Sequence, residues 1–513
     1  MKVNTSQREL DISHMLKVSV EQFYGIECED FPCQIAQVGM WLVDHQMNLE
    51  VSDRFGQYFA RLPLSQSATI FHGNALRLDW ESVVLKGELS YILGNPPFVG
   101  HQWRNAEQAE DMDIVYSNSG KYGKLDYVCS WYKKATDYMA GTKIQAAFVS
   151  TNSICQGESV STMWEPLFAQ GIEITFAYHS FFWSNEAKGK AAVNCIIVGF
   201  AVAGIVKVKQ IYGQDAVVEA SNINGYLLPA PNIFIQSRGK PLTPGIPEMS
   251  KGSQPTDGEN LIFSSTERDG LISKFPQAEK WIKRYMSGKD FINNTVRYCL
   301  WLKDIAPSEY RAIRPIMNRL EKVSESRKRS PTASVRRDAD KPMLFTQIRQ
   351  PSTMFLALPV VSSEKRKYIP IGYLEPDIIA SDQIYIVPNG SLQLFAILTS
   401  SVHMVWSRVI CGRLEMRYRY SPAIYNNFPW PEVSDMQKAE TEKLAQAILD
   451  SRALFPESSL ADLYDPLTMP PELLKAHSAL DKAVMGLYGF AKGMTEADIV
   501  AKLMELYRGM AGP

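Results

Sequence analysis

Features of secreted, metal-binding and membrane proteins are scarce in this sequence. Its seven cysteines are scattered, and none lies in the Cys-x-x-Cys pair of a typical zinc site, so no metal centre is expected. Reduced thiols and a cytoplasmic location are expected instead. Residues 1–10 are polar and contain no apolar signal core. The most apolar run, 195–206, is too short to span a bilayer, so it predicts buried strands and no contact with a membrane.

A dominant charge, internal repeats and low-complexity tracts are also lacking. The formal net charge is -1, with 45% hydrophobic and 21% charged residues, which is typical of an ordinary globular protein. Contact with nucleic acid would therefore depend on a local basic surface rather than on bulk charge. The 513 residues are enough for roughly two to four domains.

The most informative stretch is a proline-stiffened loop after an apolar run at residues 91–93, which predicts a buried strand. Gly94 allows a sharp turn, and Pro96 and Pro97 fix φ and have no N–H, so Asn95 and Phe98 should be held rigidly. The Asn95 amide oxygen and the Pro96 carbonyl can accept both hydrogens of an exocyclic amine. Phe98 offers a flat face on which a base can stack. A rigid turn after a core strand is the alternative that these residues alone leave open.

The elements before this loop follow the order of a doubly wound nucleotide-binding domain. A β-prone run at 16–26 ends at Glu27, residues 30–49 have helical spacing, and a second β-prone run from residue 69 leads to Asp79. Glu27 is the candidate for binding ribose hydroxyls, and Asp79 for accepting from the adenine amine of a nucleoside cofactor. For Glu27 the alternative is an ordinary surface glutamate at a strand-helix junction.

Several motifs together resemble the methyltransferase part of MmeI-like (Type IIL) restriction-modification enzymes. They are Phe23-Tyr24-Gly25-Ile26-Glu27, Gly94-Asn95-Pro96-Pro97-Phe98-Val99-Gly100, Leu125-Asp126-Tyr127-Val128 and the segment 183–193. The resemblance implies an α/β, Rossmann-like fold and methyl transfer from S-adenosyl-L-methionine to adenine N6 in double-stranded DNA with a flipped target base. It implies catalytic roles for Asn95, Pro96, Pro97 and Phe98, and cofactor binding by Glu27, Asp79 and Asn95.

The same resemblance suggests that Trp183 packs on the flipped base and that Lys188 meets a phosphate. A core tryptophan and a solvated lysine are the plainer alternatives.

No Gly-x-Gly occurs anywhere in the chain. Methyltransferases of this kind open their sheet with a glycine-rich turn, because a Cβ there would collide with the cofactor. In the family this turn precedes the strand that ends at Glu27, so the methyltransferase domain is expected to be truncated at its N-terminus and the nuclease region to be absent. The expected partners are therefore DNA and an upstream-encoded chain that supplies the cofactor loop. The alternative function is a catalytically silent DNA-recognition half that needs such a partner.

The predicted division is a methyltransferase domain at 1–221, a Pro- and Gly-rich crossing at 222–264, an α+β target-recognition domain at 265–431 and C-terminal helices at 432–513. The alternation in residues 413–421 puts Glu415, Arg417 and Arg419 on one face if the segment is extended. Arginine can bind guanine through two hydrogen bonds, and glutamate accepts from cytosine N4.

The resemblance assigns base reading to these three side chains and to Gln383; a charged surface strand is the alternative. The basic stretch 327–337 fits a phosphate backbone or a solvated face equally well. A protein or RNA methyltransferase would share the Asn-Pro-Pro loop, but the long downstream domain argues against that class.

Overall fold

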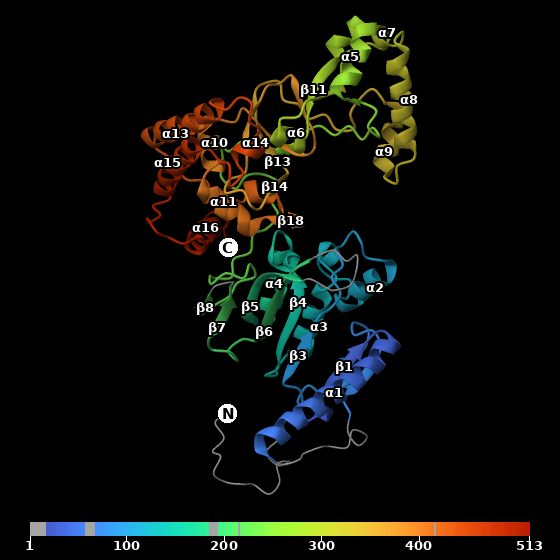
Figure 1. Cartoon of the computed structure of the whole chain (residues 1–513), viewed down its shortest axis with the longest axis vertical. Helices are drawn as coiled ribbons and strands as arrows, with labels where there is room; N and C mark the ends of the chain where they lie inside the picture. Colours follow the sequence, from blue (N-terminus) through green and yellow to red (C-terminus); the bar gives the residue numbers. More distant parts are fainter. Residues whose placement is uncertain (1–16, 57–66, 184–192, 214–215, 415–416, 513) are drawn as a thin grey trace. The chain divides into compact units, whose positions relative to one another are not determined.

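The computed structural model describes residues 17–56, 67–183, 193–213, 216–414 and 417–512 (Figure 1). The chain forms two compact units, each with its own core. The first comprises Met1–Ile154, Thr162–Trp183 and Cys195–Ile223, and the second comprises Cys155–Ser161, Ser184–Asn194 and Asn224–Pro513.

The first unit begins with a parallel strand pair and the helix that connects it. β1 (Tyr24–Glu27) pairs with β2 (Thr69–His72), and α1 (Asp30–Phe55) lies between them in sequence. The predicted order of strand, helix and strand is thus confirmed. The N-cap of α1 is Glu29, and its C-cap is Gly56, which lies in the left-handed region at φ 64°.

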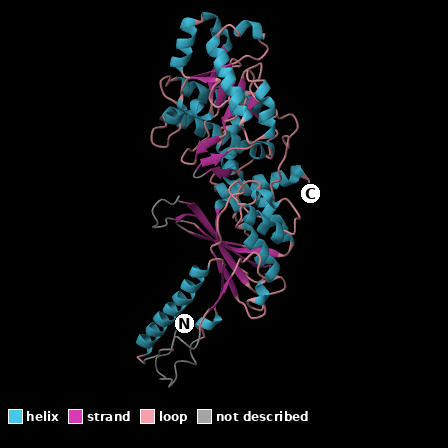
Figure 2. Cartoon of the chain, turned by 90° about the vertical axis from the view of Figure 1, so that its right-hand side faces the viewer, coloured by secondary structure: helices cyan, strands magenta, loops and turns pink. Residues whose placement is uncertain are grey.

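A mixed six-stranded sheet forms the body of this unit, in the order β3-β4-β6-β5-β7-β8. β3 and β4 are parallel, as are β5 and β7, whereas the β4–β6 and β7–β8 pairs are antiparallel. The strands twist strongly relative to one another (Figure 2). Their bounds are β3 Tyr91–Gly94, β4 Gln145–Thr151, β5 Ile172–Trp183, β6 Val193–Val202, β7 Lys209–Tyr212 and β8 Val217–Ala220.

Aromatic side chains form the core behind this sheet. Tyr132, on α3 (Cys129–Met139), packs edge-on against Phe148 and Trp164 and stacks with Phe200. All four rings are almost completely buried. This cluster fixes α3 and β4 behind β3, so the loop that follows β3 has a rigid support. The other helices here are α2 (Ala106–Val115) and α4 (Ser159–Ala169).

The second unit begins with small sheets and short helices. Two four-stranded sheets have the orders β10-β12-β11-β16 and β15-β13-β17-β9, and a three-stranded sheet has the order β14-β19-β18. Their strands are β9 Ser250–Lys251, β10 Ile262–Phe263, β11 Ile282–Met286, β12 Arg297–Leu300, β13 Phe355–Pro359, β14 Val361–Ser363, β15 Gly372–Leu374, β16 Ile378–Ala380, β17 Ile384–Pro388, β18 Gly412–Leu414 and β19 Arg417–Arg419. The helices are α5 Ser265–Lys274, α6 Gly288–Asn293, α7 Pro307–Tyr310, α8 Arg314–Lys328, α9 Ala333–Arg337, α10 Leu392–Leu398, α11 Ser401–Ile410 and α12 Pro422–Asn426.

Four helices, α13 (Asp435–Ala453), α14 (Leu460–Leu463), α15 (Pro471–Leu487) and α16 (Glu496–Ala511), end the chain (Figure 1). A capping box is present at α16, where Thr495 and Asp498 exchange hydrogen bonds. The predicted fold class, an α/β domain followed by an α+β domain and C-terminal helices, is confirmed. Among the described residues, no helix is long and apolar enough to cross a bilayer.

Candidate active site

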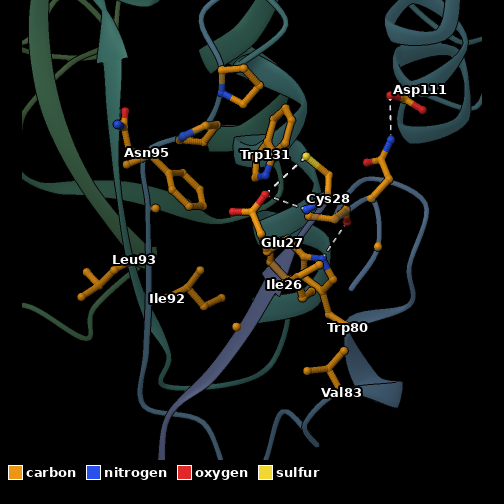
Figure 3. Close-up of a pocket in the computed structure, with 18 of the residues that line it drawn as sticks. Ile26, Glu27, Cys28, Trp80, Val83, Ile92, Leu93, Asn95, Asp111 and Trp131 are labelled. Carbon is orange, nitrogen blue, oxygen red and sulfur yellow. Dashed lines mark hydrogen bonds between the residues drawn. The ribbon is translucent and has the colours of Figure 1, made fainter. Parts of the chain in front are cut away.

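A cavity of about 780 Å³ lies in the first unit, along β1 and β3 and beyond the carboxyl ends of β1, β2 and β3. Its lining includes Glu27 from β1, Asn74 after β2, and Asn95, Pro96 and Pro97 after β3. Figure 3 shows Glu27 and Asn95 at the same end of the cavity, above Ile26 and Ile92. The carboxyl ends of parallel strands are where open α/β sheets bind ligands. The structure therefore brings together the proline-stiffened loop and one of the two acidic candidates.

The turn into the loop depends on Gly94. A Cβ at this position would lie 3.1 Å from the ring of Phe148, which is buried in the core and cannot retreat far. Pro96 is buried and Asn95 is exposed, so the proline anchors the loop while the amide is presented. Phe98 is half-buried and is absent from the described residues that line the cavity. Its stacking role stays a prediction.

Glu27 is oriented by the start of α1. Its Oε1 atom accepts hydrogen bonds from the main-chain N–H groups of Cys28 at 2.8 Å and Glu29 at 3.3 Å. A carboxylate at this place is favoured, because the first N–H groups of a helix are unpaired within it. These contacts use Oε1, so Oε2 is the atom positioned to accept from a ligand hydroxyl.

The side chain of Asp79 makes a structural hydrogen bond. Its side chain accepts from the N–H of Glu81 at 3.1 Å and caps the short 3-10 helix η3 (Trp80–Ser82). It is not among the described residues that line the cavity, although the neighbouring Trp80 is. The structure thus does not place Asp79 with Glu27 and Asn95, and cofactor binding by Asp79 stays a prediction.

Sequence reasoning missed a buried carboxylate beside the cavity, Asp111 on α2. It accepts from Asn74 Nδ2 at 2.9 Å, the bond drawn at Asp111 in Figure 3. It also accepts from Arg77 Nε at 2.5 Å and from the Tyr127 hydroxyl at 2.5 Å. Burial opposes ionisation, yet these three donors together hold the pKa of Asp111 below its ordinary value. The only signal in the sequence was an aspartate on the inward face of a helix, because its partners are distant along the chain.

The predicted DNA-contacting residues lie in several places. Trp183 ends β5, and its side chain is outside the described residues, as are Lys188 and Glu415 entirely. Arg417 and Arg419 are exposed on β19, on either side of the buried Tyr418, which agrees with the predicted alternation.

Gln383 lies near these arginines. Its carbonyl accepts from the N–H of Val360 at 3.0 Å, and the next residue, Val361, pairs with Arg419. The structure thus brings Gln383 and both described arginines to one region of the second unit.

Within the basic stretch 327–337, Arg327 does not face solvent. It is 1% exposed, and its guanidinium donates to carbonyl oxygens of five residues: Pro255, Thr256, Asp338, Lys341 and Leu344. Interpreting Arg327 as part of a phosphate-binding or solvated face was wrong, because burial and carbonyl partners occupy all its donors.

An α/β sheet with an Asn-Pro-Pro-Phe turn after one strand and a glutamate after another is the arrangement of the amino-methylating methyltransferases. Three family models match successive parts of the chain: the DNA-methyltransferase domain of MmeI at residues 1–213, its target recognition domain at 229–432 and its C-terminal domain at 433–512. The chain belongs to the MmeI family.

Two relatives support this assignment. The solved structure of the Type IIL restriction-modification enzyme MmeI in complex with DNA is 44% identical, with a TM-score of 0.90, and the match covers 98% of this chain and 68% of that one. DNA methyltransferase A of Bacillus subtilis (strain 168) is 36% identical over 497 residues, which are 96% of this chain. The chain spans 56% of the length of the Bacillus relative.

Proposed function

We propose that the chain transfers a methyl group from S-adenosyl-L-methionine to adenine N6 at a specific site in duplex DNA, as part of a restriction-modification system in the cytoplasm. The observation that carries this proposal is the shared cavity of Asn95, Pro96 and Glu27 at the strand ends. Membership of the MmeI family supports adenine as the target and DNA as the partner. By itself the loop suits the exocyclic amine of cytosine as well.

The cavity residues fit the proposed cofactor. Glu27 Oε2 suits a ribose hydroxyl, and the apolar Ile26, Trp80 and Val83 suit the flat face of an adenine (Figure 3). When bound there, the cofactor supplies an electrophilic methyl group.

The loop residues would then act by positioning. Asn95 Oδ1 and the Pro96 carbonyl accept the two hydrogens of the target amine, which directs its lone pair away from both oxygens. Because Pro96 and Pro97 restrict the main chain, little entropy is lost when the base is held. Catalysis comes mostly from this orientation, and Phe98, Trp183 and Lys188 are proposed to hold the flipped nucleotide.

The test is a titration of purified 1–513 with S-adenosyl-L-methionine, followed by labelled-methyl transfer to mixed-sequence DNA. Saturable binding and incorporation into adenine would support the proposal. Incorporation into cytosine, protein or RNA would contradict it.

A second candidate is a DNA-recognition half that needs a partner chain for cofactor binding, and the open edge of β1 favours it. The N–H of Thr69 donates to the carbonyl of Phe23, and the N–H of Gly73 to the carbonyl of Glu27. Alternate residues of β1 therefore direct their main-chain N–H and C=O groups toward β2. The main-chain groups of Tyr24 and Ile26 point away from β2.

The edge of β3 is open in the same manner. The N–H of Gln145 donates to the carbonyl of Ser90, so the main chain of Tyr91 and Leu93 points away from β4. Among the strands that the structure describes, β1 and β3 each end their sheet, and both line the same cavity. Open edges are sites for pairing with another strand.

The helix that follows β1, α1, presents apolar side chains to solvent. Phe31, Ile35, Val38 and Leu42 recur at helical spacing along α1 and are 51% to 71% exposed. Such a stripe suits a protein partner. We therefore propose that an upstream-encoded chain supplies a strand that pairs between β1 and β3.

Repeating the titration with and without the product of the adjacent upstream gene separates the two candidates. Binding that appears only with the added product would establish the second candidate. Equal binding in both samples would exclude it.

A further inference from the structure

The loop that carries Asn95 is fastened at its far end. Pro96 and Pro97 have no N–H, so they cannot donate a main-chain hydrogen bond to hold the loop. Val99, immediately after Phe98, is bonded through both of its main-chain groups. Its N–H donates to Asp126 Oδ1 at 3.1 Å, and its carbonyl accepts from the N–H of Tyr127 at 3.0 Å.

Asp126 is itself fixed at the start of α3. The same Oδ1 atom accepts from the N–H of Val128 at 3.2 Å, and the carboxylate also bonds the hydroxyl of Ser153, which follows β4. Burial raises the pKa of Asp126, although these donors and the charge of Arg104 oppose the rise. Four surrounding groups hold the half-buried carboxylate of Asp126 in place. This carboxylate can therefore fix the position of Val99 closely.

The neighbouring Tyr127 connects the hydrogen-bonded Val99 and Asp126 to the other side of the cavity. Its hydroxyl bonds Asp111, which accepts in turn from Asn74 and Arg77 in the segment that follows β2. The β1–β2 pair and the six-stranded sheet are separate sheets, so side-chain bonds of this kind link the strand ends that surround the cavity.

We infer that Asp126 is a positioning residue for the Asn95–Phe98 loop, and that Tyr127 couples this loop to the segment after β2. The inference deepens the proposed methyl transfer and rests on it. Asp126 does not touch the target base; it acts by fixing Val99, and through Val99 the direction in which Asn95 and Pro96 present their oxygens.

The variants are Asp126→Ala, which removes the acceptor; Asp126→Asn, which keeps an oxygen facing Val99; and Tyr127→Phe, which removes only the bond to Asp111. Asp137→Asn is the matched control, because Asp137 is an exposed aspartate on α3, the helix that follows Asp126, and is paired with Lys133. Amide hydrogen exchange and methyl transfer are measured on the chain 1–513 for each.

Asp126→Ala should speed exchange at the Val99 amide by about tenfold or more, because that N–H loses its acceptor. Its turnover should fall about 10- to 100-fold with cofactor affinity nearly unchanged. In Asp126→Asn, exchange at Val99 and turnover should both stay close to the parental values. Tyr127→Phe should speed exchange in the segment after β2 and leave Val99 protected. Asp137→Asn should behave as the parent.

Unchanged exchange at Val99 in Asp126→Ala, or equal defects in Asp126→Ala and Asp126→Asn, would overturn the inference. Fast exchange throughout β4 and β6 in Asp126→Ala would assign the residue to the stability of the fold instead. If the parent chain transfers no methyl group, the proposed function fails, while exchange at Val99 still decides the role of Asp126.

Discussion

The guanidinium of Arg327 donates to the carbonyl of Pro255 at 2.8 Å. This bond joins the end of α8 to a segment 72 positions earlier in the chain, and four further carbonyls complete the cage. Arginine suits such a cage because its planar fork carries five donors in fixed directions.

Arg327→Met should therefore destabilise the second unit by about 3 kcal/mol or more, since several buried carbonyls would lose their donor at once. Urea unfolding followed by tryptophan fluorescence measures the change. Arg329→Met is the control, because Arg329 is 81% exposed and its pair with Glu325 contributes little. Equal unfolding midpoints for the two variants would show that the cage does not stabilise the fold.

Asn95→Ala should abolish methyl transfer and leave DNA binding largely intact, because the amide oxygen is needed only to hold the target amine. Labelled-methyl incorporation and a DNA-binding titration on the same preparation measure the two effects. Transfer at the parental rate would remove Asn95 from the catalytic set.

Arg417→Ala should reduce discrimination at one base pair by about 1–3 kcal/mol, because an arginine that binds guanine through two hydrogen bonds contributes that much. Binding to a panel of DNA duplexes with single substitutions measures it. Lys438→Ala removes one charge from an exposed site on α13 and should weaken binding to all duplexes equally or not at all. Uniform weakening by Arg417→Ala would reassign the residue to phosphate contact.

Acidification should destabilise the second unit through His403. This residue is 1% exposed, its Nε2 lies 2.8 Å from the Tyr420 hydroxyl, and burial lowers its pKa to about 3. Below about pH 6.5 the unfolded chain takes up a proton that the folded chain refuses, so stability falls as the pH drops toward 3, by up to about 1.4 kcal/mol per pH unit.

His403→Gln cannot take up this proton, and its stability should depend less on pH over the same range. Urea unfolding between pH 4.5 and 7 tests the difference. Identical slopes for parent and variant would mean that His403 does not contribute.

Local patterns predicted most of the first unit. The helix after Glu27 and a strand in the apolar run 195–206 appear where the sequence pattern placed them. The apolar run at 91–93 also forms a strand, but not the buried strand that was predicted, because Tyr91 and Leu93 are 64% and 78% exposed. The surroundings of charged side chains were not predicted. Arg327 looks solvated in sequence but is enclosed by carbonyl oxygens. Asp79 caps a 3-10 helix, a contact that the sequence did not reveal, and its role in cofactor binding stays a prediction. Such roles depend on partners far along the chain or on backbone geometry, which no local period encodes.

The residues around Asp111 show the same limit, because here a role was missed rather than wrongly assigned. Asn74, Arg77 and Tyr127 carry ordinary surface chemistry in sequence, and only the packing of α2 beside the end of β2 makes them ligands of one carboxylate. The candidate site was therefore predicted where a rigid local motif defines it, and missed where tertiary contacts support it.

Phe148 belongs both to the wall of the cavity and to the aromatic core, where it packs against Tyr132 and Phe200. The Gly94 turn lies directly against its ring. Substitutions that enlarge or shrink this core will therefore shift the Asn95–Phe98 loop as well. A change at Phe148 would therefore alter the stability of the core and the rate of methyl transfer together.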